Sequence, residues 1–141
     1  MKQSILSLTL ALSAAAMLHP VAGLAHAFIT DMEADAGSYH VVEIAVPHGC
    51  KGTATHTVRV KIPEGITLVR PEGKPGWQLS YTTRKSNEPY VTSEGARLTE
   101  VADEVTWSGG KLADSELGRF SLMVKLPDAP NSTLYFKTIQ I

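Results

Sequence analysis

Two stretches of the chain alternate between apolar and polar residues with a period of two, and this pattern limits the possible folds most. Within residues 55–62 the apolar positions are Val58, Val60 and Ile62, and basic residues separate them. Residues 120–126 repeat the alternation. Such a pattern is typical of β-strands that bury one face and leave the other in water. The sequence therefore predicts sheets that pack one face against a core.

Further short stretches are rich in β-branched and aromatic residues, and turns containing proline or glycine separate them. We expect strands over residues 26–33, 39–46, 55–62, 66–69, 77–81, 98–107, 120–126 and 134–141. The chain should leave strand structure at 86–89 and 108–110, and only residues 112–117 could hold a helical turn. Many short strands between turns predict an all-β fold, an antiparallel β-sandwich.

The first 25 residues have the layout of a secretory signal peptide. A basic residue near the start precedes an apolar run over residues 5–18, and small residues follow at Gly23 and Ala25. These are the −3 and −1 positions of a cleavage site. A retained membrane anchor is the less favoured alternative, because a span needs about 20 apolar residues; cuts at neighbouring alanines are others. We expect residues 1–25 to be removed and the mature domain to cover 26–141.

Composition and motifs exclude several functional classes for the mature domain. The full sequence has a net charge of −1, which gives no basic surface for nucleic acid. No apolar stretch after the leader is long enough to cross a membrane, so we expect no integral membrane segment. We find neither a Gly-x-Ser-x-Gly nucleophile motif nor a phosphate-binding glycine loop. Residues 26–141 have the length of one ordinary domain.

The chain has one cysteine, Cys50, in a loop bounded by proline and glycine. Thiols of exported proteins are usually paired, so an odd cysteine is unusual. The sequence ends at Ile141 within a predicted strand. We expect it to be a C-terminally truncated form of a longer protein, with the disulfide partner of Cys50 in the missing part. The alternative is a buried free thiol that acts as a small core residue.

Six stretches follow one another in a recognisable order: His26, Val46–Cys50, Val58–Gly65, Lys74–Trp77, Val105–Gly110 and Leu134–Phe136. In this order they resemble the YcnI-like family of exported bacterial copper-associated proteins. The resemblance implies an immunoglobulin-like or cupredoxin-like β-sandwich, located in the periplasm or secreted. It also implies Cu(II) binding by an N-terminal histidine, with a carboxylate completing the site and a tryptophan nearby. The family pattern continues with a cysteine and a tryptophan-containing segment that this chain lacks.

The proposed metal ligands begin with His26, which cleavage after Ala25 would make the first residue. Its α-amine and imidazole Nδ1 would then form a bidentate nitrogen chelate. Cu(II) favours nitrogen and oxygen donors in tetragonal geometry, and binding should weaken as the pH falls because the amine must lose its proton. The resemblance places the carboxylate ligand at Asp114, and Glu116 is the alternative.

We therefore expect a copper carrier, buffer or chaperone, not an enzyme, with Cu(II) as its ligand. Its partners would be another exported copper protein or a membrane copper transporter. A copper oxygenase is an alternative, but it requires a second histidine ligand from His40, His48 or His56. A metal-free interaction sandwich is a further alternative. Trp77 and Trp107 are expected in the core or on a sheet face.

Overall fold

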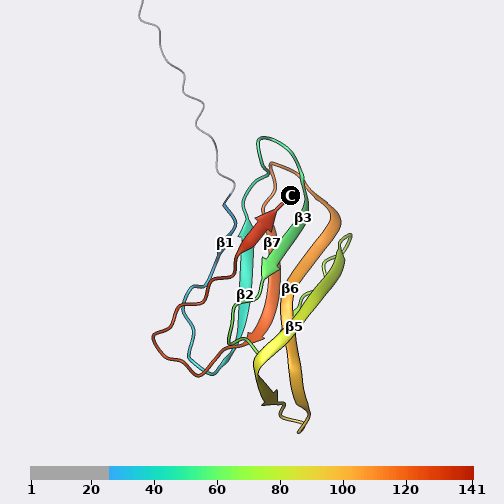
Figure 1. Cartoon of the computed structure of the whole chain (residues 1–141). Coiled ribbons are helices and arrows are strands. Elements are labelled where there is room, and N and C mark those ends of the chain that lie inside the picture. Colours follow the sequence, from blue (N-terminus) through green and yellow to red (C-terminus); the bar gives the residue numbers. More distant parts are fainter. Residues whose placement is uncertain (1–25) are drawn as a thin grey trace, which may run out of the picture.

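The computed structural model describes residues 26–141, and the expected signal peptide and its cleavage site lie outside the described residues. The described residues form β-strands, turns and loops. They contain no helix that is long and apolar enough to cross a membrane. Figure 1 shows the strands in chain order. They are β1 (Phe28–Ile29), β2 (Tyr39–Val46), β3 (Thr55–Lys61), β4 (Val69–Pro71), β5 (Gln78–Val91), β6 (Arg97–Leu112), β7 (Gly118–Lys125) and β8 (Thr138–Gln140).

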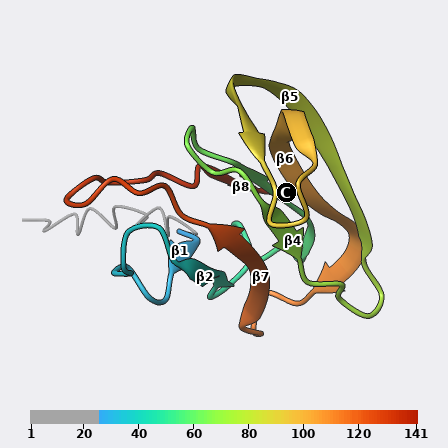
Figure 2. The same cartoon turned by 90° about the horizontal axis from the view of Figure 1, so that it is seen from below.

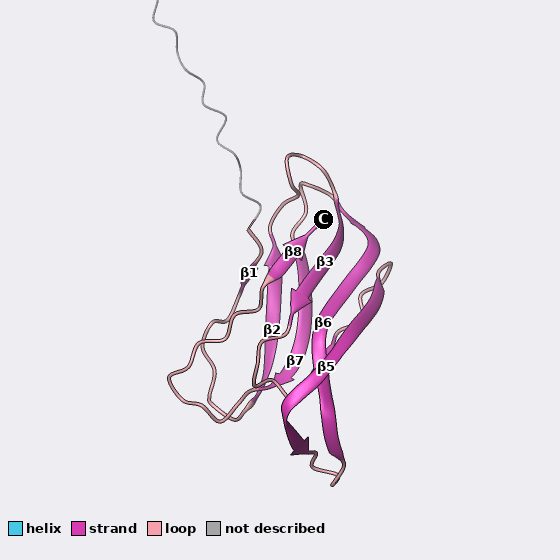
Figure 3. Cartoon of the chain, in the orientation of Figure 1, coloured by secondary structure: helices cyan, strands magenta, loops and turns pink. Residues whose placement is uncertain are grey.

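The strands form two four-stranded sheets in which every neighbouring pair is antiparallel. One sheet has the order β1-β2-β7-β4, and the other has the order β5-β6-β3-β8. Figure 3 shows that the described chain is built from strands and loops alone, and Figure 2 shows the two layers from below. The predicted all-β antiparallel sandwich is confirmed.

The core lies between the two sheets and follows from the alternation in the sequence. In β2 and β7, Ile44 pairs with Phe120 and both are buried. In β3 and β6, Val58 pairs with Trp107 and Val60 with Val105, and these four side chains are completely buried. The intervening residues of β3 are polar and reach solvent. The period of two therefore places one face of each strand in the core.

Three aromatic rings, those of Trp77, Trp107 and Phe120, pack against one another in this core. The ring of Phe120 lies 5.0 Å from that of Trp77 and 5.5 Å from that of Trp107, both edge to face. The indole N–H of Trp107 donates a 2.8 Å hydrogen bond to the backbone carbonyl of Glu72. This bond satisfies the donor of a buried tryptophan. Trp107 is thus buried in the core and the partly buried Trp77 packs against it, which agrees with the prediction of core or sheet-face positions.

The expected breaks in the two longest strands are wrong. β5 continues through residues 86–89, and β6 continues through 108–110 to Leu112. The β5–β6 pairing absorbs the first stretch in a register shift between Lys85 and Tyr90. Pro89 is tolerated there because β5 is an edge strand.

The stretch 108–110 is accommodated in the pairing of β3 with β6. The register shifts between Thr55 and Thr57. Gly109 lies at this irregularity with a φ of 74°, a left-handed conformation that glycine adopts without steric cost. Gly109 and Gly110 therefore lie in a β-bulge and do not end the strand.

Other strand limits also differ from the prediction. In place of the strand expected at 66–69, β4 begins three residues later and ends two residues later, although Ile66 remains a buried core residue. Residues 113–117 form a turn without helix. The first and last strands are shorter than expected, with two and three residues. Both are edge strands, each paired on one side only.

Candidate metal site

His26 lies two residues before β1, and its side chain is exposed. β1 pairs with β2 in a register that places Phe28 opposite Ala45. Continued by two residues, this register puts His26 level with Pro47, immediately after the end of β2. Ala27 packs against the hydrophobic core. The chain is therefore attached to the sandwich directly after His26, and β1 sets the end of the sandwich at which this residue lies.

Asp114 and Glu116 lie in the exposed turn between β6 and β7. β7 begins at Gly118, which pairs with Val46 at the end of β2. The turn consequently lies at the same end of the sandwich as His26 (Figure 1). Because β2 lies between β1 and β7 in the sheet, the backbones of β1 and β7 are two strand spacings, or roughly 10 Å, apart.

The two carboxylates have different surroundings. Oε2 of Glu116 accepts a 3.1 Å hydrogen bond from the backbone N–H of Ala113, which holds it within its own turn. Asp114 instead lies against the loop after β2: a methyl group added to Gly49 would lie 2.8 Å from its Oδ1. Asp114 therefore contacts the loop that leaves the strand next to β1. Of the two predicted carboxylate ligands, Glu116 accepts a hydrogen bond within its own turn, whereas Asp114 faces the neighbouring loop.

The structure brings His26, Asp114 and Glu116 to one end of the sandwich but does not bring them into one cluster. Across residues 26–141, no three His, Cys, Asp or Glu side chains form a group that could hold a metal ion. A terminal histidine chelate does not require such a group, since its amine and imidazole supply two donors from one residue. The arrangement that these positions allow is a chelate at His26 and one carboxylate that reaches it from the neighbouring turn.

His40 is distant from this end of the sandwich along β2. It lies in β2, seven residues before Pro47, which is level with His26 in the β1–β2 register. At about 3.3 Å per residue, the separation along the strand is roughly 23 Å. His40 therefore does not lie where a second ligand to a metal at His26 would be needed.

His48 and His56 each use one ring nitrogen within the fold. Nδ1 of His48 lies 2.7 Å from the carbonyl oxygen of Gly49. Nδ1 of His56 lies 2.7 Å from the carbonyl oxygen of Gly110. A carbonyl can only accept, so each imidazole donates from Nδ1. Only Nε2 of either ring is left for any other contact.

The loop after β2 carries Cys50 on a tight turn. The backbone N–H of Thr53 donates to the carbonyl of Cys50 at 3.1 Å, and its hydroxyl donates to the same oxygen at 2.6 Å. Lys51 and Gly52 both have positive φ, which closes the turn. The thiol of Cys50 is exposed. The alternative of a buried core thiol is therefore wrong, and the disulfide with a residue outside this chain stays a prediction.

Comparisons with known proteins place this sandwich in a family. One solved structure is similar over 81% of this chain and 80% of its own, with 21% sequence identity and a TM-score of 0.49. It is an uncharacterized protein from Nocardia farcinica whose crystal structure is described as revealing an immunoglobulin-like fold. No curated protein matches the chain. The model of the domain of unknown function DUF1775 matches residues 26–141, the whole described domain. The chain therefore belongs to the DUF1775 family.

Proposed function

We propose that this protein, after cleavage behind Ala25, binds one Cu(II) ion through the α-amine and Nδ1 of His26. The observation that carries this proposal is the position of His26. It is exposed, it lies two residues before β1, and it is the residue at which the family match begins. The resemblance of the sequence to YcnI-like proteins supports the same ligand.

The fold supports such a chelate because it holds the terminus on a fixed strand. Phe28 and Ile29 pair with β2, and Ala27 packs against the core. The backbone next to the chelate is thus restrained, while the imidazole remains exposed. Cu(II) would meet two nitrogen donors, a carboxylate oxygen and water, which is a donor set that it favours.

An exposed terminal site fits a protein that takes up and gives away its metal. We therefore propose the role of an exported copper carrier, buffer or chaperone, acting in the periplasm or outside the cell. Copper is its cargo, and the partner would be another exported copper protein or a membrane copper transporter. The oxygenase alternative needs a second histidine ligand: His40 is distant, whereas His48 and His56 donate from Nδ1 to a carbonyl and keep Nε2 available, as metal-bound histidines do.

The direct experiment is a Cu(II) titration of protein that begins at His26, followed by electron paramagnetic resonance. We expect one equivalent of Cu(II) per chain and a tetragonal spectrum with nitrogen hyperfine coupling. Affinity should fall as the pH is lowered, because protons compete for the amine and the imidazole. Absence of binding would contradict the proposal and leave the metal-free interaction sandwich. Peroxide-dependent turnover by the copper-loaded protein would favour the oxygenase instead.

The contribution of the carboxylates can be separated with two matched variants. Asp114→Ala should weaken Cu(II) binding more than Glu116→Ala, because the Glu116 carboxylate is held by the Ala113 amide. Affinities from competition titrations with a chelator of known strength measure the difference. Asp31→Asn and Glu33→Gln should have little effect, since both residues lie further along the chain after β1. Equal, unchanged affinity in both alanine variants would remove the carboxylate ligand but leave the histidine chelate in place.

A further inference from the structure

A groove of about 610 Å³ runs along one open side of the sandwich. Its two walls are the chain from His26 to Ala34, which contains β1, and the segment from Ser132 to Thr138, which leads into β8. β1 is the edge of one sheet and β8 is the edge of the other. The groove thus lies where the two sheets have no further strand to close the space between them. Its volume is within the range of about 300–1,000 Å³ that small-molecule sites span.

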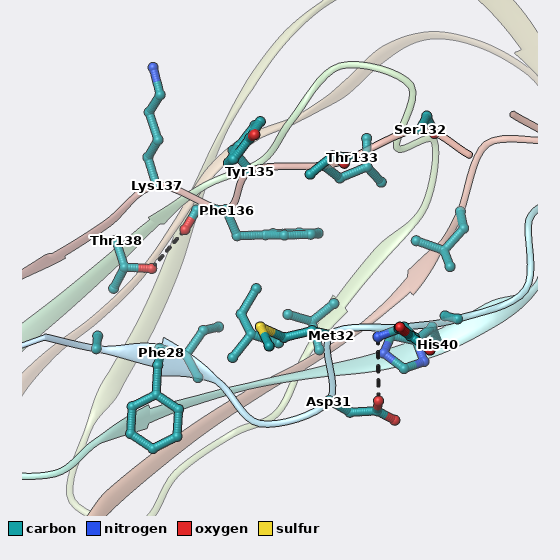
Figure 4. A pocket seen from close by; sticks show the side chains of 18 of the residues that line it. Phe28, Asp31, Met32, His40, Ser132, Thr133, Tyr135, Phe136, Lys137 and Thr138 are labelled. Carbon is teal, nitrogen blue, oxygen red and sulfur yellow. Dashed lines mark hydrogen bonds between the residues drawn. The ribbon is translucent and has the colours of Figure 1, made fainter. Parts of the chain in front are cut away.

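The floor and walls of the groove are mainly apolar. The lining side chains include those of Ile29, Val42, Ile44, Leu126, Leu134 and Phe136. Figure 4 shows the ring of Phe136 between the two walls, with Met32 on the facing wall. The side chains of Tyr135 and Lys137 point away from the groove. The space could therefore take an apolar chain and remove it from water, at roughly 25 cal/mol for each Å² of apolar surface buried.

One end of the groove is acidic. The backbone N–H of Thr30 donates to the carbonyl of Glu43 at 3.1 Å, so the register of β1 with β2 continues beyond Ile29. Continued by three further positions along each segment, this register would place Glu33 level with His40. Asp31, Glu33 and His40 all line the groove.

The charges around the groove have one sign. Of the residues that line it, all within the described domain, Lys137 is the single lysine or arginine, and its side chain points out of the groove. Asp31 and Glu33 therefore have no lysine or arginine side chain opposite them within the groove, and His40 is the basic side chain at this end. A ligand that carries a positive charge at this end would complement both carboxylates.

We propose that this groove binds a small elongated amphiphile with a cationic amine at one end. The apolar part lies between β1 and Phe136, and the amine lies at Asp31 and Glu33. The groove extends along β1 to His26, but its acidic end lies about seven residues of β2 away from the level of His26. The inference therefore does not rest on copper binding, and both can be tested separately.

The test uses matched probes that share one tail: dodecylamine and dodecyl sulfate, each below its micelle concentration, with butylamine as the short-tailed amine. The protein is the chain from His26, which contains the whole sandwich and its core, in metal-free buffer at pH 8. At this pH an ordinary imidazole is neutral, while an alkylamine with a pKa like that of lysine, about 10.4, keeps its charge. Isothermal titration calorimetry gives the affinities.

The two methionines of residues 26–141, Met32 and Met123, report where the probe binds. Met32 lines the groove, whereas Met123 lies on β7 opposite Val41, whose side chain is on the solvent face of the sheet. With labelled methionine methyl groups, dodecylamine should shift the Met32 resonance in a saturable manner and leave Met123 unchanged. Butylamine should bind more weakly, because it buries less apolar surface.

The acidic end is tested by the double variant Asp31→Asn, Glu33→Gln. Exposed ion pairs contribute about 0.2–1 kcal/mol each, so the loss of both charges should reduce dodecylamine affinity by roughly 2- to 30-fold. Dodecyl sulfate should bind the wild type more weakly than dodecylamine does, and the double variant should narrow or reverse this preference. The control Glu88→Gln, Glu94→Gln removes two exposed carboxylates from the β5–β6 hairpin and should leave both affinities unchanged.

Three results would overturn the proposal. Equal affinity for the amine and the sulfate would show that the acidic end selects nothing. Shifts confined to Met123 would place the probe on the outer face of the sheet. If the Asp31→Asn, Glu33→Gln variant binds dodecylamine as tightly as the wild type does, these two carboxylates are not where the amine binds. Because no copper is present, none of these results bears on the chelate at His26.

Discussion

Acetylation of the His26 α-amine should abolish tight Cu(II) binding by the processed protein. It converts the amine into an amide, so the chelate ring cannot form although the imidazole is unchanged. Loss of an outer-shell partner of a metal ligand typically costs about 10- to 100-fold in affinity. Loss of a direct ligand together with its chelate ring should cost at least as much. Competition titration against a chelator of known affinity measures the change.

Two companions make this experiment specific to the terminus. His26→Ala, which removes the imidazole and keeps the amine, should damage binding by a factor similar to that of acetylation. His40→Gln serves as the matched histidine control, since His40 lies in β2 well away from His26. An affinity that survives blocking of the amine would rule out the terminal chelate, whatever the remaining histidines contribute.

The fold was largely predictable because its core depends on a local pattern. The alternation in residues 55–62 and 120–126 appears in the structure as β3 and β7, each with one face buried. β2 has the predicted bounds. A period of two is a property of neighbouring residues, so no knowledge of the rest of the chain is required to detect it.

The errors lie where a distant strand decides the local structure. Residues 86–89 and 108–110 contain residues typical of turns, yet both continue as strands because β5 and β6 pair along their length and absorb irregularities as register shifts. The first and last strands are also short. Each lies at a sheet edge and pairs with only two or three residues of a longer partner strand.

The candidate sites show the same division. The type of donor at His26 could be inferred from the sequence, but the relation of Asp114 to Gly49 and of Glu116 to Ala113 could not. The groove was not predicted at all. Its walls come from segments about a hundred residues apart, and no local pattern indicates that two sheet edges will face each other across a space.

Gly110→Ala should be among the most destabilising single-methyl additions to this domain. A Cβ atom at this position would overlap Cε2 and Cδ2 of the Trp77 ring. The ring cannot yield easily, because its other side packs edge to face against Phe120. Overpacking costs about 1–3 kcal/mol, and loss of an aromatic pair adds about 0.5–1.5 kcal/mol. We expect a loss of roughly 2–4 kcal/mol in the free energy of unfolding, measured by chemical denaturation.

The control for this substitution is Gly73→Ala, where an added methyl meets no atom within 4 Å and the backbone has no positive φ. It should be neutral or slightly stabilising, because alanine restricts the unfolded chain. The cause can be tested with Trp77→Ala, introduced alone and together with Gly110→Ala. If the ring is the obstacle, the glycine substitution should cost much less once the ring is absent, so the two changes should couple by at least about 1 kcal/mol. Additive losses, or a Gly110→Ala protein as stable as Gly73→Ala, would show that Trp77 does not require glycine at position 110.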